Sequence, residues 1–324
     1  MRTVFFGSDL FSYPSLKAIH GLIKNPSDLI VATRLLKPSG RGQNTVIEPP
    51  VVSYAKQNGL KWLQIETLRD FENLQSDFDP QLAVAVSYGK LIPALFINNL
   101  EFGGLNVHPS LLPQYRGAAP LQRAIMDLQP RTGVSVQTLH PTKFDHGRLL
   151  WQKQVDLSRS VTLFELRDQL AELGAMGLSQ VISEQLLVGD FELPSTAAPS
   201  VAPLIDRREF RVNFKNSAAK VDATGRALGK LWFEQEMTVT KKRKTKTVNV
   251  RVNLEEFVPL DLADNSPPGT ISMQGTGETA ALALRVADGY IGARCVTVAG
   301  FGRGTALDYF TNKDKRGLSS SANL

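Results

Sequence analysis

Short apolar runs alternate with longer amphipathic stretches through the first part of the chain. The apolar runs predict strands at Arg2–Gly7, Asp28–Thr33, Lys61–Ile65, Gln81–Val86, Leu105–His108, Thr132–Leu139 and, as a strand or hairpin arm, Trp151–Leu157. The stretches between them predict helices at Ser12–Leu22, Pro49–Asn58, Thr67–Leu74, Leu91–Asn98, Gly117–Leu128 and Ser160–Leu187. Strands that alternate with helices are typical of an α/β fold with a doubly wound parallel sheet.

The pattern changes after residue 193. Pro194–Pro203 is rich in Pro, Ala and Ser and has no periodicity, which indicates a linker. Short alternating segments separated by glycine turns then recur at Met237–Val252, Pro268–Ser272, Ala281–Val286 and Tyr290–Val298. We therefore expect a Rossmann-like α/β domain over residues 1–193, a linker over 194–206, and a small OB-like β-barrel domain over 207–324.

Composition narrows the class of protein. The chain has 324 residues, of which 42% are hydrophobic and 21% charged, as expected for a globular protein. No apolar run reaches the ~18 residues of a membrane span, so no membrane partner is expected. The single cysteine, Cys295, excludes an internal disulfide and fits a reducing compartment. One Cys and four scattered His form no zinc pattern, and we expect no metal site.

Basic residues are concentrated in the C-terminal part. Residues 1–200 hold 18 Lys or Arg and 18 Asp or Glu, whereas residues 201–324 hold 19 and 13, so the whole net charge of +6 lies in the second segment. Such asymmetry favours an anionic partner there, most simply a nucleic acid. A basic surface without a partner is the alternative that composition leaves open.

Candidate chemistry lies in the stretch Gly103–Pro113. Asn106 and His108 are separated by one residue, so in a strand both side chains project from the same face. Pro109 ends that strand, because proline has no N–H to donate to a neighbouring strand. A neutral amide and an imidazole would then point together from the carboxyl end of a strand, which is where open α/β sheets bind ligands.

The context of this pair resembles a known family. Asn106–Ile125, Thr132–Val136 and Phe144–Gly147 follow the pattern Asn-X-His-Pro-Ser-Leu-Leu-Pro, Tyr/Trp-Arg-Gly-Ala-Ala-Pro and Asp-X-Gly. This pattern is similar to that of the formyltransferases that take a formyl group from 10-formyltetrahydrofolate, most closely those that act on methionyl-tRNA. Lys143-Phe-Asp-X-Gly resembles the mitochondrial spelling more than the bacterial Asp-Thr-Gly.

The resemblance implies a catalytic set made of Asn106, His108 and Asp145. Formyl transfer to an amine passes through a tetrahedral intermediate, and Asn106 and a protonated His108 would donate hydrogen bonds to its oxygen. Asp145 would accept the amine proton or keep His108 charged. The neighbouring His146 would be a second acid or base, or only a substitution in the loop.

The resemblance also implies a folate site with 10-formyltetrahydrofolate as co-substrate. Main-chain groups of the loop after the fourth strand would bond the folate ring, although an ordinary turn remains the alternative for Ser87 and Lys90. The implied folate-binding residues are Ser87, Tyr88, Gly89, Lys90, Leu91, Ile92, Ser110, Leu111, Leu112, Pro113 and Phe144.

Initiator methionyl-tRNA is the partner that the resemblance implies. The Gly-rich loop Lys37–Asn44 would enter the acceptor end of the tRNA, with Arg41 as its recognition residue, or would be a plain connection. A second basic run lies in the C-terminal domain and would contact phosphates, or would be a solvated hairpin tip. The implied tRNA-binding residues are Lys37, Arg41, Lys241, Lys242, Arg243, Lys244 and Lys246.

Other functions share parts of this pattern. A formyltransferase that acts on an amino sugar or on glycinamide ribonucleotide, or a formyltetrahydrofolate hydrolase, would have the same catalytic set. A nucleic-acid-binding module without catalysis would have the same basic C-terminal domain. We expect a monomer in the mitochondrial matrix. The first strand begins at Arg2 and leaves no room for a transit peptide, so a bacterial or cytosolic location is the alternative.

Overall fold

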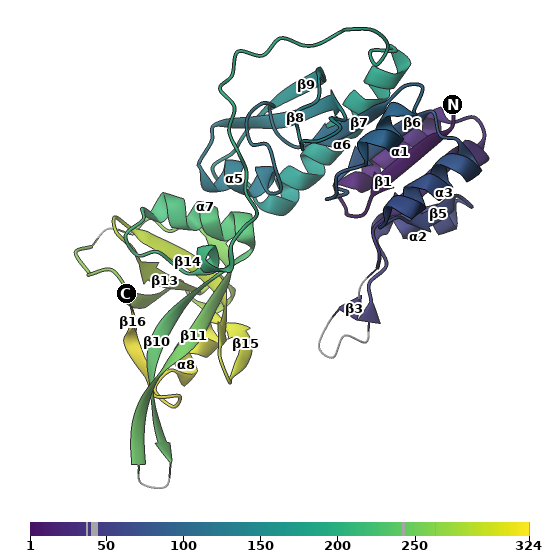
Figure 1. The fold of residues 1–324 in the computed structure, drawn as a ribbon. Helices are drawn as coiled ribbons and strands as arrows, with labels where there is room; N and C mark the ends of the chain where they lie inside the picture. Colours follow the sequence, from purple (N-terminus) through teal and green to yellow (C-terminus); the bar gives the residue numbers. More distant parts are fainter. Residues whose placement is uncertain (37, 40–44, 242–243, 263, 324) are drawn as a thin grey trace. The chain divides into compact units, whose positions relative to one another are not determined.

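The computed structural model describes residues 1–36, 38–39, 45–241, 244–262 and 264–323 (Figure 1). The chain forms two units. One consists of Met1–Leu121, Arg131–Asp156 and Phe164–Leu204, and the other of Gln122–Pro130, Leu157–Leu163 and Ile205–Leu324. Each unit has its own sheet, and each is described by itself.

The first unit is built on a mixed sheet with the strand order β5-β2-β1-β6-β7-β8-β9. The strands are β1 Thr3–Gly7, β2 Leu29–Thr33, β5 Lys61–Gln64, β6 Leu82–Val86, β7 Gly104–His108, β8 Arg131–Thr138 and β9 Leu149–Asp156. Neighbouring strands from β5 to β7 are parallel, whereas β8 is antiparallel to β7 and β9 is antiparallel to β8. The predicted α/β fold is thus confirmed, with an antiparallel edge added.

Helices cover both faces of this sheet. They are α1 Ser12–Leu22, α2 Pro50–Gln57, α3 Leu68–Phe78, α4 Ala94–Asn98 and α6 Leu163–Ser183, with the 3₁₀ turn η1 Pro26–Asp28; α5 Pro120–Met126 begins in this unit and continues in the second. Phe6 on β1 packs against Phe71 of α3 and Phe96 of α4, with ring centroids 5.8 and 6.1 Å away. Phe5 points to the opposite face, because successive strand residues alternate, and both phenylalanines are fully buried.

The central strands are apolar because both of their faces are covered. Every residue of β1, β2 and β6 is buried. This explains why these strands appear in the sequence as continuous apolar runs rather than as alternating patterns. A short pair, β3 Pro38–Ser39 with β4 Thr45–Val46, lies between β2 and α2.

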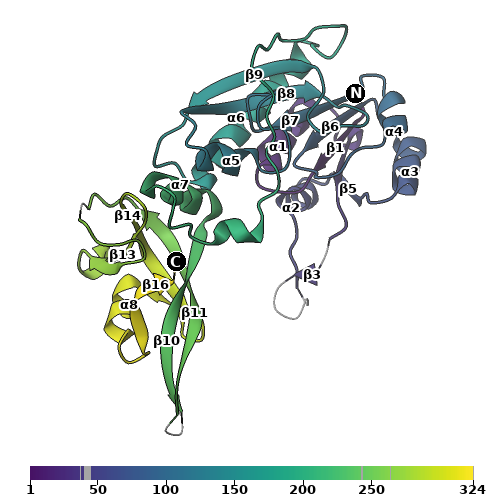
Figure 2. The same cartoon turned by 60° about the vertical axis from the view of Figure 1, so that its left-hand side comes forward.

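The second unit is a curled antiparallel sheet with the order β12-β13-β14-β11-β10-β16, to which β15 is added beside β14. Its elements are η2 Arg207–Phe210, α7 Ala218–Leu228, β10 Lys230–Lys241, β11 Lys244–Val258, β12 Ile271–Gln274, η3 Gly277–Thr279, β13 Ala281–Arg285, β14 Tyr290–Val298, β15 Gly302–Thr305, α8 Ala306–Asn312 and β16 Leu318–Asn323. Figure 2 shows the long β10–β11 hairpin extending beyond the rest of this sheet.

The two ends of this sheet meet and close it. Thr270, just before β12, forms an isolated bridge with Ser321 of β16, and Ala322 N donates to Gly269 O at 2.8 Å. Closure removes the exposed edges that an open sheet would present. The predicted OB-like barrel is therefore confirmed.

One buried polar contact ties α8 to the inside of the barrel. The Tyr309 hydroxyl donates to Gln235 Oε1 at 2.8 Å, and Gln235 Nε2 donates to Ser319 O at 2.6 Å. Tyr309 is 1% and Gln235 0% exposed, so each would be costly to bury without its partner. Burial raises the pKa of Tyr309 to about 12, which keeps the phenol protonated as a donor.

Two segments from the first half of the chain belong to the second unit through polar contacts. Arg123 forms a bidentate ion pair with Glu209, with Nη2 to Oε1 at 2.9 Å. Lys220 Nζ lies 3.1 Å from Asp127 Oδ1, and the guanidinium of Arg226 donates to the Val161 carbonyl. These contacts explain why 122–130 and 157–163 group with residues 205–324.

Candidate active site

Asn106 and His108 lie at the carboxyl end of β7, and Asp145 lies in the loop that joins β8 to β9. The β7–β8 register places Asn106 opposite Gln137 and His108 opposite Ser135. The residues at these positions are all polar, and Ser135 and Gln137 are buried. Polar side chains thus line one face of two adjacent strands, as predicted for Asn106 and His108 alone.

Asp145 is the centre of the cluster. Its Oδ1 accepts hydrogen bonds from Asn106 Nδ2 and Gln137 Nε2, each at 3.2 Å, and lies 3.3 Å from His108 Nδ1. Its Oδ2 accepts from the Gly117 backbone N at 2.8 Å. The side chain is only 8% exposed, and every partner is a donor. The two carboxyl oxygens of Asp145 therefore lie within reach of four potential donors.

His108 is held at both ring nitrogens. Nδ1 faces Asp145, and Nε2 lies 2.9 Å from the Tyr115 carbonyl oxygen. The side chain is 7% exposed. A carbonyl oxygen can only accept, so both contacts are hydrogen bonds only when both nitrogens carry hydrogen. Both ring nitrogens of His108 therefore face oxygen acceptors.

The loop that carries Asp145 is shaped by its glycine and by Gln137. Asp145 has φ 56°, a left-handed conformation that needs support from its surroundings. Gly147 packs on β8 so closely that a Cβ there would overlap the Thr138 carbonyl. Gly147 N donates to Gln137 Oε1 at 3.1 Å, so the Gln137 amide holds both ends of the Asp-X-Gly turn.

Gln137 and Ser135 are site residues that the sequence reasoning missed. Both lie on the predicted strand Thr132–Leu139, two residues apart, so their side chains share one face of that strand. Two polar side chains on the same face of an otherwise apolar strand could have indicated a site. Ser135 Oγ donates to Ser110 O at 2.6 Å and accepts from Leu112 N at 3.1 Å. Gln152 Nε2 adds a bond of 3.0 Å to Leu112 O.

These bonds fix the predicted folate segment Ser110–Pro113 against the middle of β8 and β9. Ser110 and Leu112 are buried, whereas Leu111 and Pro113 are half-buried. Ser110 Oγ donates to Gln114 O at 2.6 Å, which closes the turn. Side-chain hydrogen bonds thus hold the segment that follows His108 and Pro109 in the chain.

The other predicted folate segment, Ser87–Ile92, follows β6, the strand beside β7. Tyr88 and Ile92 belong to the core on the α3–α4 face of the sheet. The Tyr88 hydroxyl donates to Ile65 O at 2.8 Å, and burial raises its pKa. Ser87, Gly89 and Leu91 are exposed. Ser87, Gly89 and the Leu91 side chain therefore face solvent, although Ser87 O accepts a hydrogen bond from Ser8 Oγ at 3.3 Å.

The Lys90 side chain forms an ion pair with Glu66. Its Nζ donates to Glu66 Oε1 at 2.9 Å and to Glu66 O at 2.8 Å. The hydrogen bond from Lys90 lowers the pKa of the Glu66 carboxyl. Arg34 Nη2 lies 3.7 Å from the same carboxylate, so Glu66 links the loops after β2, β5 and β6.

Phe144 and His146 flank Asp145. Phe144 is 51% exposed, so its ring offers an apolar surface next to the carboxylate. His146 Nδ1 lies 2.5 Å from Phe144 O, and its Nε2 lies 3.4 Å from Arg116 Nη1. The carbonyl is an acceptor and the guanidinium a donor, so both ring nitrogens of His146 have polar partners. They hold His146 away from the Asp145 carboxylate.

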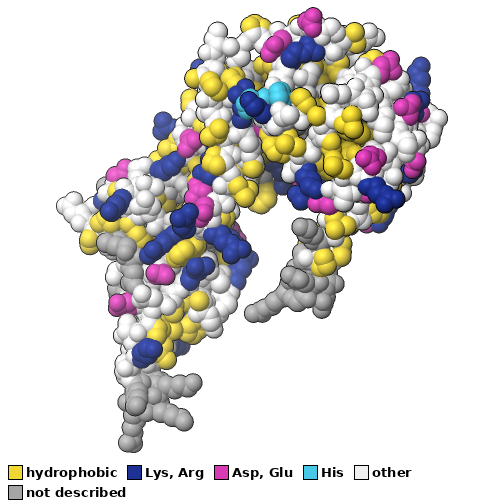
Figure 3. Space-filling view, in the orientation of Figure 1, with side chains coloured by type: hydrophobic (Ala, Val, Ile, Leu, Met, Phe, Trp, Pro, Cys, Tyr) yellow, Lys and Arg dark blue, Asp and Glu magenta, His cyan; other side chains and the backbone are white. Residues whose placement is uncertain are grey.

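The predicted tRNA-binding residues are only partly within the described structure. Lys37, Arg41, Lys242 and Arg243 lie outside the described residues, and of Lys241 and Lys244 only the backbone is described, as a pair that ends β10 and begins β11. Lys246 is exposed on β11. Figure 3 shows Lys and Arg side chains gathered on the visible face of the unit that carries this hairpin.

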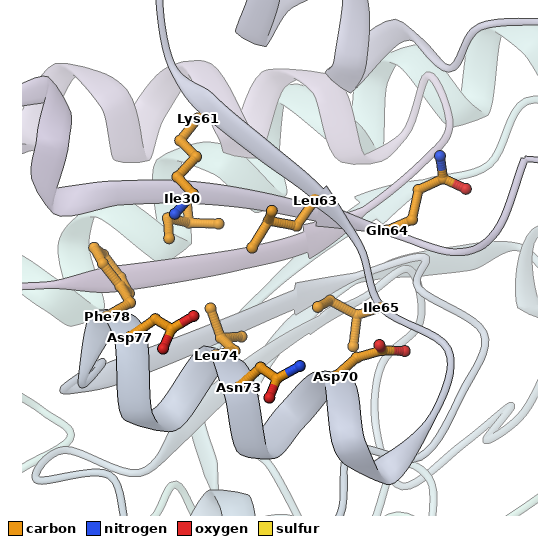
Figure 4. Close-up of a pocket in the computed structure, with 10 residues that line it drawn as sticks. All are labelled: Ile30, Lys61, Leu63, Gln64, Ile65, Asp70, Asn73, Leu74, Asp77 and Phe78. Carbon is orange, nitrogen blue, oxygen red and sulfur yellow. The ribbon is translucent and has the colours of Figure 1, made fainter.

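A separate cavity of about 230 Å³ lies between β5 and α3 (Figure 4). Ile30, Leu63 and Leu74 form its apolar wall, and Lys61 and Asp77 stand at its rim. It lies at the β5 edge of the sheet, whereas the polar cluster lies at β7 and β8, so the two sites are distinct.

Over the residues that the structure describes, no cluster of His, Cys, Asp or Glu could hold a metal ion. None of the described helices is long and apolar enough to cross a membrane.

Comparisons with known proteins show the family of this chain. Residues 1–182 match the formyl transferase family. Methionyl-tRNA formyltransferase of Caldicellulosiruptor saccharolyticus is 31% identical over 98% of this chain and 99% of its own. The mitochondrial methionyl-tRNA formyltransferase of Saccharomyces cerevisiae is 32% identical over 79% of this chain and 75% of its own. A putative methionyl-tRNA formyltransferase of Schizosaccharomyces pombe is 33% identical over 64% of this chain, which spans only 58% of that relative.

Solved structures share the fold at low identity. An N-formyltransferase from Helicobacter canadensis, in complex with folinic acid and dTDP-3-aminofucose, aligns with a TM-score of 0.61 at 15% identity over 90% of this chain and 98% of its own. HypX from Aquifex aeolicus, in complex with tetrahydrofolic acid, aligns with a TM-score of 0.57 at 14% identity over 96% of this chain and 47% of its own.

Proposed function

Since the chain belongs to the formyl transferase family, we propose that it transfers a formyl group from 10-formyltetrahydrofolate to the amino group of initiator methionyl-tRNA. The observation that carries this proposal is the match to a methionyl-tRNA formyltransferase over 98% of the chain. The Asn106–His108–Asp145 cluster supplies the groups that such a reaction needs.

The reaction joins the methionine nitrogen to the formyl carbon and breaks the bond between that carbon and N10 of the folate. The amine loses one proton and N10 gains one, so the reaction needs no oxidant or reductant. Negative charge develops on the formyl oxygen in the tetrahedral intermediate. Stabilising that oxygen is the largest contribution that a protein makes to most acyl transfers.

Asn106 and His108 are the donors to this oxygen. Asn106 uses one N–H on Asp145 and keeps a second N–H, and His108 shares its Nε2–H between the Tyr115 carbonyl and the formyl oxygen. Asp145 accepts from four donors, so it serves mainly to hold the imidazolium and to orient both side chains. It is the nearest carboxylate to which the amine proton can pass.

The folate residues expected from the sequence fit a flat, partly polar ring. Ser87 and Gly89 are exposed residues whose main chain would bond the folate ring, and Leu91 and Phe144 offer exposed apolar side chains at 42% and 51%. Lys90 acts indirectly in this proposal, because its ammonium is paired with Glu66. The segment Ser110–Pro113, held by Ser135 and Gln152, forms a fixed wall.

The tRNA is bound by the basic C-terminal domain and by the Lys37–Asn44 loop. We assign catalysis to residues 1–193, the connection to 194–206, and RNA binding to 207–324. An excess of six positive charges in residues 201–324 supports this division. Phosphate contacts supply affinity, and Arg41 supplies discrimination at the acceptor end.

The enzyme works as a monomer in the mitochondrial matrix under this proposal. Its relatives include a yeast mitochondrial enzyme as well as bacterial ones, and formyl-methionine initiation belongs to both settings. Fractionation of the source cells tests the location, and enzyme found in the cytosolic fraction would contradict it. The mass measured by light scattering tests the oligomeric state, and the mass of a dimer would contradict a monomer.

A turnover assay tests the proposed reaction. Purified enzyme and 10-formyltetrahydrofolate are offered charged initiator methionyl-tRNA, charged elongator methionyl-tRNA, an amino-sugar nucleotide, glycinamide ribonucleotide or water. We expect rapid formylation of the initiator tRNA only. Preferential formylation of a small amine, or hydrolysis of the donor, would replace the proposed substrate. No turnover with any acceptor would leave a nucleic-acid-binding module.

A further inference from the structure

The backbone of Tyr115–Gly117 touches both catalytic side chains. The Tyr115 carbonyl lies 2.9 Å from His108 Nε2, and Gly117 N donates to Asp145 Oδ2 at 2.8 Å. The position of this three-residue segment therefore decides which partners the imidazole and the carboxylate have. Its placement matters as much as that of the two side chains.

This segment has a conformation that local preferences do not supply. Tyr115 has φ 56° and Gly117 has φ 121°, both in regions that L-residues rarely adopt. Such conformations persist only where surrounding structure holds them. The Ser135 and Gln152 bonds secure the preceding turn, but they end at Leu112.

The chain that leads from α6 toward the second unit holds the segment. Ser200 Oγ accepts from Tyr115 N at 2.9 Å, and Ser200 O accepts from Arg116 N at 2.9 Å. Arg116 O accepts from Ala202 N at 2.7 Å, and Ala202 O accepts from Ala119 N at 3.1 Å. Ser200 N also donates to Pro113 O at 3.2 Å. Both segments that make this contact belong to the first unit.

The contact is close as well as hydrogen-bonded. A Cβ on Gly117 would lie 2.8 Å from the Ala202 carbonyl oxygen, so only glycine fits against the neighbouring chain. Ala202 is fully buried, whereas Val201 between the two contact residues is 75% exposed. The attachment is thus made by backbone and by the Ser200 hydroxyl, which is why Pro- and Ala-rich composition concealed it.

We propose that Ser200–Ala202 is a positioning element of the active site rather than part of a free linker. It fixes the Tyr115 carbonyl and the Gly117 amide, and through them it sets the hydrogen bonds of His108 and Asp145. The inference rests on the proposed catalytic roles of these two side chains. Ser200 is its most specific residue, since its hydroxyl is the acceptor for the N–H of Tyr115, the residue whose carbonyl faces His108.

Full-length variants test this role. Ser200→Ala removes the hydroxyl acceptor, Ser200→Thr keeps it, and Ser195→Ala makes the same change at an exposed position earlier in the connection. We expect Ser200→Ala to lower kcat by roughly tenfold with little change in the KM for 10-formyltetrahydrofolate, because small misplacements at a reacting centre are costly. Ser200→Thr should restore most of kcat, and Ser195→Ala should match wild type.

Amide hydrogen exchange gives a readout that does not depend on the substrate. In the protein without substrates, Ser200→Ala should speed exchange at Tyr115–Gly117 relative to wild type and to Ser195→Ala. Ala202→Pro, which removes the N–H that bonds Arg116 O, should do the same. Faster exchange with unchanged kcat would make the contact merely structural, and unchanged exchange would overturn the positioning role itself. If the wild-type enzyme formylates another amine instead of methionyl-tRNA, the kcat of the variants is measured on that amine. The role of Ser200 can therefore be tested even if the proposed substrate is wrong.

Discussion

Gln137 on β8 lies directly opposite Asn106 on β7, and the amide groups of both side chains donate to the same oxygen of Asp145 at 3.2 Å. The two amides therefore fix the carboxylate from adjacent strands. Each amide nitrogen keeps a second N–H, but Gln137 is 1% exposed whereas Asn106 is half-buried, so only the second N–H of Asn106 is open to a substrate. We regard Gln137 as a positioning residue and Asn106 as a catalytic one.

Replacing Gln137 should impair turnover through Asp145. Gln137→Leu removes the donor to Asp145 and the acceptor for Gly147, and we expect kcat to fall about 10–100-fold, as for other second partners of catalytic groups. Gln137→Glu keeps the shape but places a second carboxylate beside the first, and it should lose at least as much. Steady-state kinetics on methionyl-tRNA measure both effects. The exposed Gln154 on β9 provides the control, as Gln154→Glu. Wild-type kcat in Gln137→Leu would remove the residue from the mechanism.

Alanine substitutions of the catalytic cluster should act as a unit. We expect Asn106→Ala, His108→Ala and Asp145→Ala each to reduce kcat by at least about 10²–10³-fold, the loss typical of an oxyanion donor, with tRNA binding nearly unchanged. The Asn106/Asp145 double variant should lose little more than the worse single variant, because the side chains share one network. Fully multiplicative losses would show that the two groups act independently.

The fold and the face that carries the site follow from local patterns. Asn106 and His108 could be paired from their spacing in one strand, and Asp145 from the resemblance of its loop. The β-strand periods also predicted the barrel, since alternation and glycine turns are local signals. These features depend on neighbours in the sequence, which is why they were accessible.

The supporting contacts were not accessible, because they depend on strand register and on pairing between distant irregular segments. Gln137 meets Asp145 only when β8 pairs with β7 in the observed register. Ser200 meets Tyr115 across 85 residues of sequence, through a segment with no periodicity. The Pro-, Ala- and Ser-rich composition predicted a linker, but composition does not report what backbone groups bond to. Similarly, nothing in the sequence around Lys90 indicated that its side chain would pair with Glu66.

The basic run on the β10–β11 hairpin should contact phosphates. Replacing Lys241, Lys242, Arg243, Lys244 and Lys246 by glutamine should weaken tRNA binding and flatten the dependence of log affinity on log salt, by about 0.7–0.9 per lost contact. Lys246→Gln alone should flatten it by a single contact. The exposed Lys215 lies elsewhere in the same unit, and Lys215→Gln removes the same charge as a control. Equal slopes for Lys246→Gln and Lys215→Gln would make the hairpin a solvated tip.

Arg41 should discriminate the initiator tRNA without taking part in the chemistry. Glycines on both sides permit a sharp bend and close approach to a nucleic-acid groove, and the guanidinium offers a planar fork of donors. Arg41→Ala should lower kcat/KM on initiator methionyl-tRNA by about 10-fold or more, the value of a good bidentate contact, while the Kd of the folate is unchanged. Arg41→Lys should recover part of the loss. Unchanged kcat/KM in Arg41→Ala would return the loop to a plain connection.

The Arg123–Glu209 pair should make the stability of the second unit depend on pH. The hydrogen bond from Arg123 lowers the pKa of Glu209 below its ordinary value of 4.5. A carboxyl group whose pKa is lower in the folded state stabilises the fold above its unfolded-state pKa, and this stabilisation is lost as the pH falls through the folded-state pKa. The Arg123 and Glu209 side chains are 16% and 27% exposed, so the pair is only partly screened by solvent.

We therefore expect Glu209→Gln to lower the free energy of unfolding by about 1 kcal/mol near neutral pH. The difference from wild type should shrink once the pH falls below about 4.5, because protonated Glu209 no longer pairs with Arg123. Thermal unfolding across this range measures the difference. Glu236→Gln, at an exposed position on β10, controls for the loss of one negative charge. A Glu209→Gln difference that persists undiminished into strong acid would mean that packing, rather than the ion pair, accounts for the contribution of this residue.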